Sequence, residues 1–343
     1  MNVLVTGGAG YIGSHTVLSL LENNCNVVVF DNLFNSSIES IKRVESLTGK
    51  SVTFIEGDIR NKHQLSNVFS SHNIDTVIHF AALKAVGESA QIPLEYYQNN
   101  VHGSVCLLEA MAEHKVNNFI FSSSATVYGE ENEVPYVETM KLGTPSSPYG
   151  ATKVMVERIM ADTAASNPHF RGVSLRYFNP IGAHESGKIG ESPKGIPNNL
   201  LPYVAQVMVG KREKLSIFGS DYPTKDGTCE RDYLHVMDLA EGHVAAMKWL
   251  NDNQGFAGVE SFNLGTGNGV SVFEIVTAFE QAVDKKIPYE VSPRRAGDLP
   301  AFWANATKAN DALNWQANRS LDQMMVDTWR WQSANPNGYD EDE

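Results

Sequence analysis

The chain of 343 residues is long enough to bury a sizeable core, and its length predicts two domains or one elaborated α/β unit. Its formal net charge of −13 excludes the broad basic surface that nucleic acids or anionic membranes require, so any positive charge for an anionic ligand must be local. Short apolar runs, a first strand that begins too early for a signal peptide and three widely spaced cysteines predict a cytoplasmic protein with free thiols and no metal site.

The chain begins with a predicted strand, a glycine turn and the start of a helix. Gly7 allows a tight turn, Gly10 lets the backbone approach a pyrophosphate, and Gly13 lets the helix pack closely on its strand. The helix N-terminus, including Tyr11 and Ile12, then offers free N–H groups and a positive dipole end to phosphates. This G-x-x-G-x-x-G spacing also occurs in unrelated loops, so an ordinary strand-to-helix turn is the alternative.

A second apolar strand, residues 27–30, is followed by Asp31 at about the distance expected of a carboxylate that binds an adenosine ribose. A carboxylate accepts from a ribose 2′-OH but repels a 2′-phosphate, so Asp31 predicts NAD rather than NADP. The polar loop with Asn32, Asn35 and Ser36 follows at the strand's carboxyl end, where the ribose and phosphates of a dinucleotide would lie. A capping role for Asp31 and a plain surface turn are the alternatives.

Two more strands are predicted before residue 85. Residues 51–59 end in Asp58 and Ile59, which could contact an adenine, although Asp58 could equally be the N-cap of the helix from Asn61. Residues 76–82 turn to small side chains, as expected where backbone runs beside a ligand. The predicted contacts there are Phe80, Ala81, Ala82 and Lys84, the last of which is otherwise a solvated loop residue.

A helix is predicted from about Leu94 to His114, with Asn99 in its first half as a further cofactor contact. Its apolar stripe comprises Val101, Val105, Leu108 and Met111. The next strand, residues 119–121, leads into three serines at its carboxyl end, where open α/β sheets bind ligands. Ser122 and Ser124 are the candidates, and a serine-rich loop is the alternative.

The most informative chemistry is the pair Tyr149 and Lys153, which follows Ser147 as N-cap and Pro148 at the first helical position. The two side chains share one helix face at i, i+4. An ammonium close to a phenol favours the phenolate, so Lys153 is predicted to lower a tyrosine pKa that is ordinarily about 10. Tyr149 is therefore predicted to be a catalytic base, with Ser124 bonding the same substrate oxygen.

These residues resemble the extended short-chain dehydrogenase/reductase family. Longer runs at 79–89, 119–129, 175–180 and 195–200 resemble the UDP-sugar epimerases of that family, and the match extends from residue 1 to about 338. The resemblance implies a doubly wound parallel (Rossmann) sheet in an NAD-binding domain, residues 1–178, and a smaller α/β substrate domain, residues 179–343. Segments at about 234–265 would return to the large domain, Tyr177 and Phe178 would join the NAD contacts, and the chain would form a homodimer.

The resemblance also implies that the region after residue 178 binds a UDP-sugar. Arg231 and Arg295 would be forked donors to phosphate oxygens, although on their own both are typical of solvated arginines. The implied substrate contacts are Lys84, Ser124, Tyr149, Asn179, Asn199, Leu200, Ser216, Ile217, Phe218, Arg231, Tyr233, Arg295, Asp298 and Phe302.

The reaction that the resemblance implies is the interconversion of UDP-galactose and UDP-glucose. Tyr149 would take the proton of the sugar 4-OH while NAD⁺ removes hydride from C4, and the 4-keto sugar would turn over before it is reduced on its other face. Lys153 would keep Tyr149 ionised and contact the nicotinamide ribose, and Ser124 would orient or relay the proton. An aromatic gate at Phe302 would exclude N-acetylated sugars, unless Phe302 only packs beside Trp303.

Three alternatives are kept. A sugar-nucleotide 4,6-dehydratase of the same family is expected to carry an Asp-Glu pair where this chain has Ser124-Ala125-Thr126. A decarboxylase, or an epimerase for another UDP-sugar, would share the fold. A nucleotide-sensing binding protein without turnover would not need Tyr149 and Lys153 together.

Overall fold

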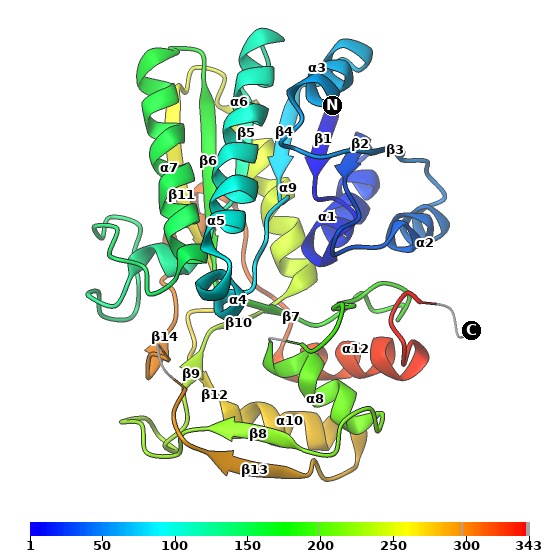
Figure 1. Cartoon of the computed structure of the whole chain (residues 1–343), viewed down its shortest axis with the longest axis vertical. Helices are drawn as coiled ribbons and strands as arrows, with labels where there is room; N and C mark the ends of the chain where they lie inside the picture. The colour runs from blue at the N-terminus through cyan, green and yellow to red at the C-terminus, as the bar shows by residue number, and fades with distance from the viewer. Residues whose placement is uncertain (198, 296–297, 341–343) are drawn as a thin grey trace.

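The computed structural model describes residues 1–197, 199–295 and 298–340. A larger body contains a central sheet, and a smaller lobe lies below the carboxyl ends of its strands (Figure 1). The sequence runs 195–200 and 294–298 each contain residues outside the described ranges.

The central sheet has seven strands in the order β11-β6-β5-β4-β1-β2-β3, and all neighbouring pairs are parallel. Because β1 pairs with β2 on one side and β4 on the other, the chain switches direction across the sheet at β1. The predicted doubly wound parallel sheet is confirmed. The strands are β1 (Asn2–Thr6), β2 (Asn26–Asp31), β3 (Thr53–Glu56), β4 (Thr76–His79), β5 (Asn118–Ser122), β6 (Arg171–Tyr177) and β11 (Gly258–Leu264).

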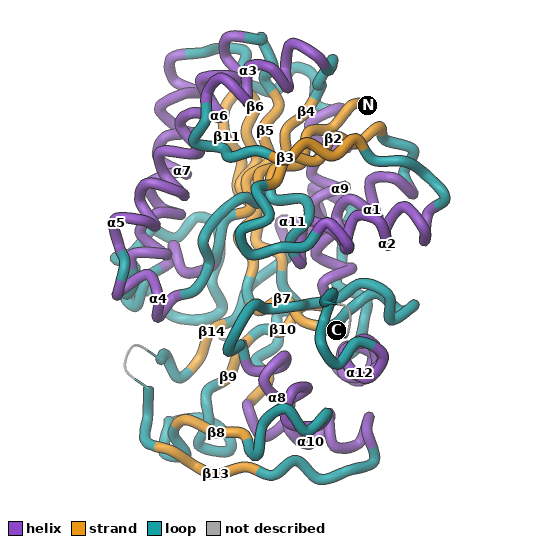
Figure 2. Tube along the Cα trace, turned by 45° about the vertical axis from the view of Figure 1, so that its right-hand side comes forward, coloured by secondary structure: helices purple, strands orange, loops and turns teal. Residues whose placement is uncertain are grey.

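Helices cover both faces of this sheet (Figure 2). Successive strand residues point to opposite faces, so Leu4 packs in the core on one side while Val3 and Val5 pack in the core on the other. The Val3 and Val5 side is covered by α1 (Tyr11–Glu22), α2 (Ile38–Thr48), α9 (Val236–Asp252) and α11 (Thr307–Leu313). The Leu4 side is covered by α3 (Lys62–Ser71), α6 (Gly103–Glu113) and α7 (Pro148–Ser166).

The single helix predicted from Leu94 to His114 is built from three segments: α5 (Pro93–Tyr96), a π-helical segment η1 (Tyr97–His102) and α6. A π segment adds a residue to a turn and commonly marks a functional site. Leu108 and Met111 of the predicted stripe are buried in the protein's own core beneath α6. That half of the stripe therefore stabilises the monomer.

The smaller lobe is built from short paired strands and three longer helices around a separate apolar core. Figure 2 shows β8 and β13 at the end of the molecule farthest from the central sheet. Its strands are β7 (Asn179–Ile181), β8 (Leu215–Phe218), β9 (Glu230–Arg231), β10 (Tyr233–His235), β12 (Val270–Ser271), β13 (Tyr289–Ser292) and β14 (Ala301–Phe302). Its helices are α8 (Leu200–Met208), α10 (Val272–Val283) and α12 (Leu321–Ala334), while α4 (Val86–Gln91) and the 3₁₀ turn η2 (Ala125–Tyr128) lie at the carboxyl edge of the large sheet.

Cys25, Cys106 and Cys229 are free and buried. Across residues 1–197, 199–295 and 298–340, no helix combines the length and apolarity needed to cross a membrane. In the same ranges, no three His, Cys, Asp or Glu side chains gather closely enough to hold a metal ion.

Strand β11 lies at the sheet edge beside β6, although about 80 residues separate them, so its packing tests the long-range assembly of the sheet. Phe262 is fully buried and its ring lies 5.5 Å from that of Trp249. We expect Phe262→Ala to lower the free energy of unfolding by about 3–5 kcal/mol. Phe34→Ala is the matched control, because Phe34 is 68% exposed and its loss should change stability by no more than about 0.5 kcal/mol. Equal urea midpoints for the two variants would contradict this packing.

Candidate active site

The glycine turn lies between the end of β1 and the start of α1, pressed against the end of β4. Gly7 has φ +71°, and a Cβ added there would lie 2.6 Å from the Ala81 nitrogen. A Cβ at Gly13 would lie 2.2 Å from the Gly7 oxygen, so the helix packs directly on the turn. A Cβ added at Gly10 would meet only the Gly7 oxygen, at 3.3 Å, so the turn is open there. No side chain caps the N-terminus of α1. The free helix N-terminus therefore fits the pyrophosphate of a dinucleotide.

Asp31 is buried at the end of β2 and organises the loops around the turn. Its carboxylate accepts from the Ala9 nitrogen (3.0 Å), the Leu33 nitrogen (2.9 Å) and the Ser36 hydroxyl (2.8 Å). Asp31 therefore bonds the neighbouring loops and caps neither α1 nor α2. A carboxylate has about four acceptor sites, so Asp31 can also accept from a ribose. Asn32 and Asn35 are exposed beside it.

Asp58 does not cap the next helix, so that alternative is wrong. The cap of α3 is Asn61, whose side-chain oxygen accepts from the nitrogens of His63 and Gln64, both at 3.1 Å. Asp58 instead makes a two-pronged ion pair with Arg60, at 2.9 and 2.6 Å, and this pair lowers the carboxyl pKa to about 2. Asp58 also accepts from Asn32 (3.3 Å), which places it next to the Asp31 loop, while Ile59 is buried.

Lys84 and Asn199 both reach Glu191, a residue that sequence analysis missed. The Lys84 ammonium lies 3.0 Å from the Glu191 carboxylate, and the Asn199 amide donates to the same oxygen at 3.2 Å. Lys84 also lies 5.9 Å from the Tyr11 ring centroid, next to the glycine turn. Glu191 thus joins the loop after β4 to the residue before α8, and a lone glutamate in a loop carries no sequence signal for this role.

Asn100 is a second missed residue. It lies in η1, is buried, and bonds the backbone of Leu83 in both directions, at 2.8 and 2.9 Å. The predicted contact Asn99 donates to the Asn100 oxygen at 3.0 Å. Asn100 therefore fixes the loop after Ala82 that carries Lys84.

The predicted catalytic residues come together at the carboxyl end of β5. Lys153 is buried, donates to the Ser122 carbonyl at 2.7 Å, and its nitrogen lies 5.7 Å from the Tyr149 ring centroid. Ser124 caps η2, accepting from the Thr126 nitrogen at 3.3 Å, and it lies close enough to Tyr149 to favour the phenolate. The Ser122 and Tyr177 hydroxyls bond each other, which joins β5 to β6 at this point.

Burial reverses the predicted shift at Tyr149. Burial raises the pKa of Tyr149 to about 12, and Ser124 opposes this only in part. Burial also lowers the pKa of Lys153 to about 7, against the opposing charge of Glu157. The expectation that Lys153 lowers the Tyr149 pKa is therefore wrong for the protein alone, because desolvation penalises both charged forms and leaves the ammonium only partly charged near neutral pH.

The smaller lobe gathers local positive charge in an acidic protein. Arg295 grips the Asp298 carboxylate at 2.9 and 3.2 Å, and Arg231 lies 3.6 Å from the same group. Arg231 also donates to the Leu299 carbonyl at 2.7 Å. Two guanidinium groups share one carboxylate, which leaves a net positive charge for a diphosphate. The Arg295 guanidinium lies 5.7 Å from the Phe218 ring centroid, next to β8.

Some predicted substrate contacts have buried side chains. Ile217 and Tyr233 pack in the apolar core of the smaller lobe, and Leu200 packs against it. Burial raises the pKa of Tyr233 to about 12. Ile217 and Tyr233 can therefore serve a ligand only through their backbone or by supporting neighbours, whereas Leu200 is partly exposed. Ser216 lies 3.5 Å from Glu290 and Asn179 begins β7, both partly exposed.

Phe302 lies between Phe178, which follows β6, and the strand that carries Arg231. Its ring centroid lies 5.0 Å from that of Phe178 and 5.3 Å from that of Tyr136. In the parallel pairing of β14 with β9, Phe302 is opposite Arg231. Trp303 packs instead against Gly269, where an added Cβ would lie 2.6 Å from its ring. Phe302 therefore contacts Phe178 and Tyr136, so its packing is not limited to Trp303.

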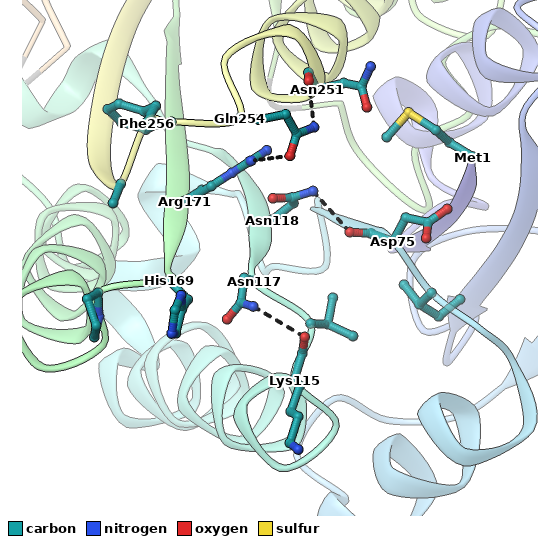
Figure 3. Close-up of a pocket in the computed structure, with 15 residues that line it drawn as sticks. Met1, Asp75, Lys115, Asn117, Asn118, His169, Arg171, Asn251, Gln254 and Phe256 are labelled. Atoms are coloured by element: carbon teal, nitrogen blue, oxygen red, sulfur yellow. Dashed lines mark hydrogen bonds between the residues drawn. The ribbon is translucent and has the colours of Figure 1, made fainter.

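A cavity of about 650 Å³ lies elsewhere, at the amino ends of the strands (Figure 3). Its lining includes Asp75, Asn118 and Arg171, and Figure 3 shows the Arg171 guanidinium reaching Gln254. A smaller cavity of about 320 Å³ lies beside Gly265 and Trp303. Ligands of open α/β sheets bind at the carboxyl ends, so the glycine turn, Tyr149 and the arginine pair define the candidate site and the 650 Å³ cavity does not.

A Tyr-x-x-x-Lys pair beside a strand-end serine and a Rossmann glycine turn is the arrangement of the extended short-chain dehydrogenase/reductases. A family model described as GDP-mannose 4,6 dehydratase matches residues 4–328. A UDP-glucose 4-epimerase of Erwinia amylovora is 61% identical over 338 residues, covering 98% of this chain and 99% of the relative. The chain belongs to the UDP-glucose 4-epimerase family within the extended short-chain dehydrogenase/reductases.

Solved structures agree with this membership. A UDP-glucose 4-epimerase of Bifidobacterium longum, in complex with NAD⁺ and UDP, has a TM-score of 0.94 at 49% identity and covers 98% of this chain and 100% of that one. An epimerase of Stenotrophomonas maltophila, with NAD and formylated UDP-arabinopyranose, has a TM-score of 0.95 at 46% identity and covers 98% and 99%.

Asp31 allows a direct test of the cofactor contact. We expect Asp31→Ser to weaken NAD binding at least about tenfold and to reduce discrimination against NADP, because a ribose acceptor and a negative charge are lost together. Glu56→Ser is the control, since Glu56 is an exposed carboxylate opposite Asp31 in the pairing of β3 with β2. Fluorescence titration of both cofactors measures the change. If the Asp31 and Glu56 variants bind NAD equally well, Asp31 serves only the loop.

Proposed function

We propose that the protein interconverts UDP-galactose and UDP-glucose with NAD as its resident cofactor. The observation that carries the proposal is the convergence of Tyr149, Lys153 and Ser124 at the sheet edge that also carries the glycine turn and the uncapped N-terminus of α1. The contact of Phe302 with Phe178 links this point to the strand of Arg231. A nucleotide diphosphate on the arginines and a sugar at Tyr149 then belong to one cleft.

The proposal divides the chain between two ligands. Residues 1–178 would bind NAD through the glycine turn, Asp31 and the loop after β4, with segments at about 234–265 completing this domain. Residues 179–343 would bind the UDP part, with Arg231 and Arg295 on the diphosphate. When bound, NAD would accept hydride from the sugar C4 and later return it. The oxidised nicotinamide carries a positive charge.

Tyr149 is the proposed acid and base of the reaction. Its phenolate would remove the proton of the sugar 4-OH, and its phenol would return that proton when the ketone is reduced on the other face. Because burial alone raises the pKa of Tyr149 to about 12, the phenolate needs nearby positive charge, which Lys153 supplies in its protonated form. Ser124 would orient the same oxygen from the strand end.

The residues of the site favour an epimerase over two of the three alternatives. A 4,6-dehydratase would use an Asp-Glu pair, but the residues after Ser124 are Ala125 and Thr126, with Ala125 buried. A nucleotide sensor would have no use for a buried lysine beside a tyrosine. An epimerase or decarboxylase for another UDP-sugar differs only in the sugar pocket and is addressed by the substrate test below.

We also propose that the protein is cytoplasmic and forms a homodimer. Leu94 of α5 and Met155 of α7 are exposed by 77% and 42%, and the two helices contact each other. An exposed apolar surface on two neighbouring helices suits the helix packing of a two-fold interface.

The assay uses the purified protein with UDP-galactose and no added cofactor, followed by separation of UDP-glucose. We expect turnover in the parent and at least about a hundredfold lower kcat in Tyr149→Phe, which loses only the hydroxyl and should keep its melting temperature. Tyr203→Phe is the control, because Tyr203 is a partly buried tyrosine of α8 in the smaller lobe. A parent without turnover, or a Tyr149 variant with near-normal kcat, would refute the assignment.

Phe302 sets the expected sugar size. The ketone must turn over inside the pocket, so an N-acetyl group at C2 needs space throughout the rotation. We expect the parent to act poorly on UDP-N-acetylglucosamine and Phe302→Cys to gain at least about tenfold in kcat/KM for it, because the ring beside Phe178 and Tyr136 is removed. Trp303→Phe controls for general loosening of this loop. Efficient parental turnover of the acetylated sugar would show that Phe302 is not a gate.

A further inference from the structure

A buried ion pair lies directly behind the proposed catalytic residues. Arg176 of β6 grips the Glu157 carboxylate with two bonds, at 3.0 and 2.7 Å, and both side chains are only 6% exposed. The Ser123 hydroxyl donates to the same carboxylate at 2.6 Å. Glu157, Arg176 and Ser123 together form the Glu157 clamp.

The clamp connects every element that carries the proposed chemistry. Glu157 lies one helical turn after Lys153 on α7, so the two side chains share a helix face. Ser123 lies between Ser122, whose carbonyl accepts from Lys153, and Ser124, which acts on the pKa of Tyr149. A shift of the Glu157 carboxylate would therefore move the strand end that orients both residues.

The clamp continues away from the site through neutral groups. Arg176 donates to the Tyr128 hydroxyl at 3.2 Å, and that hydroxyl donates to Asn263 of β11 at 2.6 Å. Asn263 in turn donates to the Tyr136 carbonyl at 2.9 Å. Buried polar networks that are fully bonded are rigid, so the carboxylate cannot relax away from Lys153 when the lysine changes charge.

Glu157 is also the acidic group that acts on the lysine. The titratable and charged groups around the Tyr149–Lys153 pair are Glu157 on α7, His79 on β4, Tyr177 on β6, which interacts with Tyr149, and Arg176 on β6, which is paired with Glu157. Burial lowers the pKa of His79 to about 3, and burial raises the tyrosine pKa values, so His79 and the two tyrosines are neutral near pH 7. Glu157 favours the charged form of Lys153, in opposition to burial.

We propose that Glu157 is a positioning residue of the reaction: clamped by Arg176 and Ser123, it holds negative charge one turn behind Lys153 and fixes the strand end that carries Ser124. This inference rests on the proposed function, because it assigns Glu157 to the activation of Tyr149. The clamp acts through Lys153 and Ser124 and does not touch the sugar.

The direction of the pH effect follows from the charges. Without the Glu157 charge, Lys153 loses its proton at lower pH, so the alkaline limb of the kcat profile moves to lower pH. A less charged Lys153 stabilises the Tyr149 phenolate less, so the acid limb of the kcat profile moves to higher pH. The profile becomes narrower from both sides, whereas a role in stability alone would leave its limbs in place.

The test compares kcat and KM for UDP-galactose between pH 5 and pH 10 in the NAD-loaded protein. We expect Glu157→Gln to lower kcat at pH 7 about tenfold with little change in KM, and to move each limb inward by about one pH unit. Glu157→Asp, which keeps the charge, should retain the parental limbs. Ser123→Ala should lower kcat severalfold without loss of the folded state. This variant tests the role of the Glu157 clamp if Glu157→Gln does not fold.

Asp238→Asn is the matched control for a broken buried ion pair. Asp238 of α9 is fully buried and paired with Arg319, away from the clamp, so its loss should lower the melting temperature but leave both limbs unchanged. Parental limbs in Glu157→Gln, unchanged kcat in Ser123→Ala, or moved limbs in Asp238→Asn would each overturn the proposal. An inactive parent would instead refute the proposed function, so the two failures are distinguishable.

Discussion

The parallel pairing of β1 with β2 on one side and β4 on the other is the constraint on which the site depends. Parallel strands end at one edge, so Gly7, Asp31 and Ala81 meet there although they are far apart in the chain. The fit is close: the Gly7 turn leaves no room for a side chain against the Ala81 backbone, and Asp31 bonds the Ala9 nitrogen within the turn. The cradle for a dinucleotide is thus a consequence of sheet order.

Electrostatics in this protein are local. A chain with a net charge of −13 places two arginines around the single carboxylate of Asp298, and it buries Lys153 where burial lowers the pKa of the ammonium. Burial of Lys153 costs free energy in the absence of a ligand, because its positive charge is incompletely compensated. A diphosphate at the arginines and a phenolate at Tyr149 would each supply the missing negative charge.

The same logic explains why the tyrosine prediction was wrong for the protein alone. The i, i+4 spacing of Tyr149 and Lys153 indicates proximity, but it carries no information about how dry the site is. Desolvation raises the pKa of one group and lowers that of the other, so the pair is poised for ionisation only when further charge is present. Glu157 on the same helix supplies negative charge that favours the protonated form of Lys153.

Sequence by itself determined the elements with strong local signals: the glycine turn, the strand-end Asp31, the serine run and the Tyr149–Lys153 helix, because each depends on spacing within a few residues. The doubly wound sheet was predicted from the family resemblance that these elements carry. Only the tertiary structure decided the partners of isolated polar residues, since Asn61 rather than Asp58 caps α3, Glu191 joins Lys84 to Asn199, and Arg176 binds Glu157. Packing brings the residues of these pairs together. They escape sequence analysis because a polar group bonds whichever donor or acceptor the fold leaves within about 3 Å.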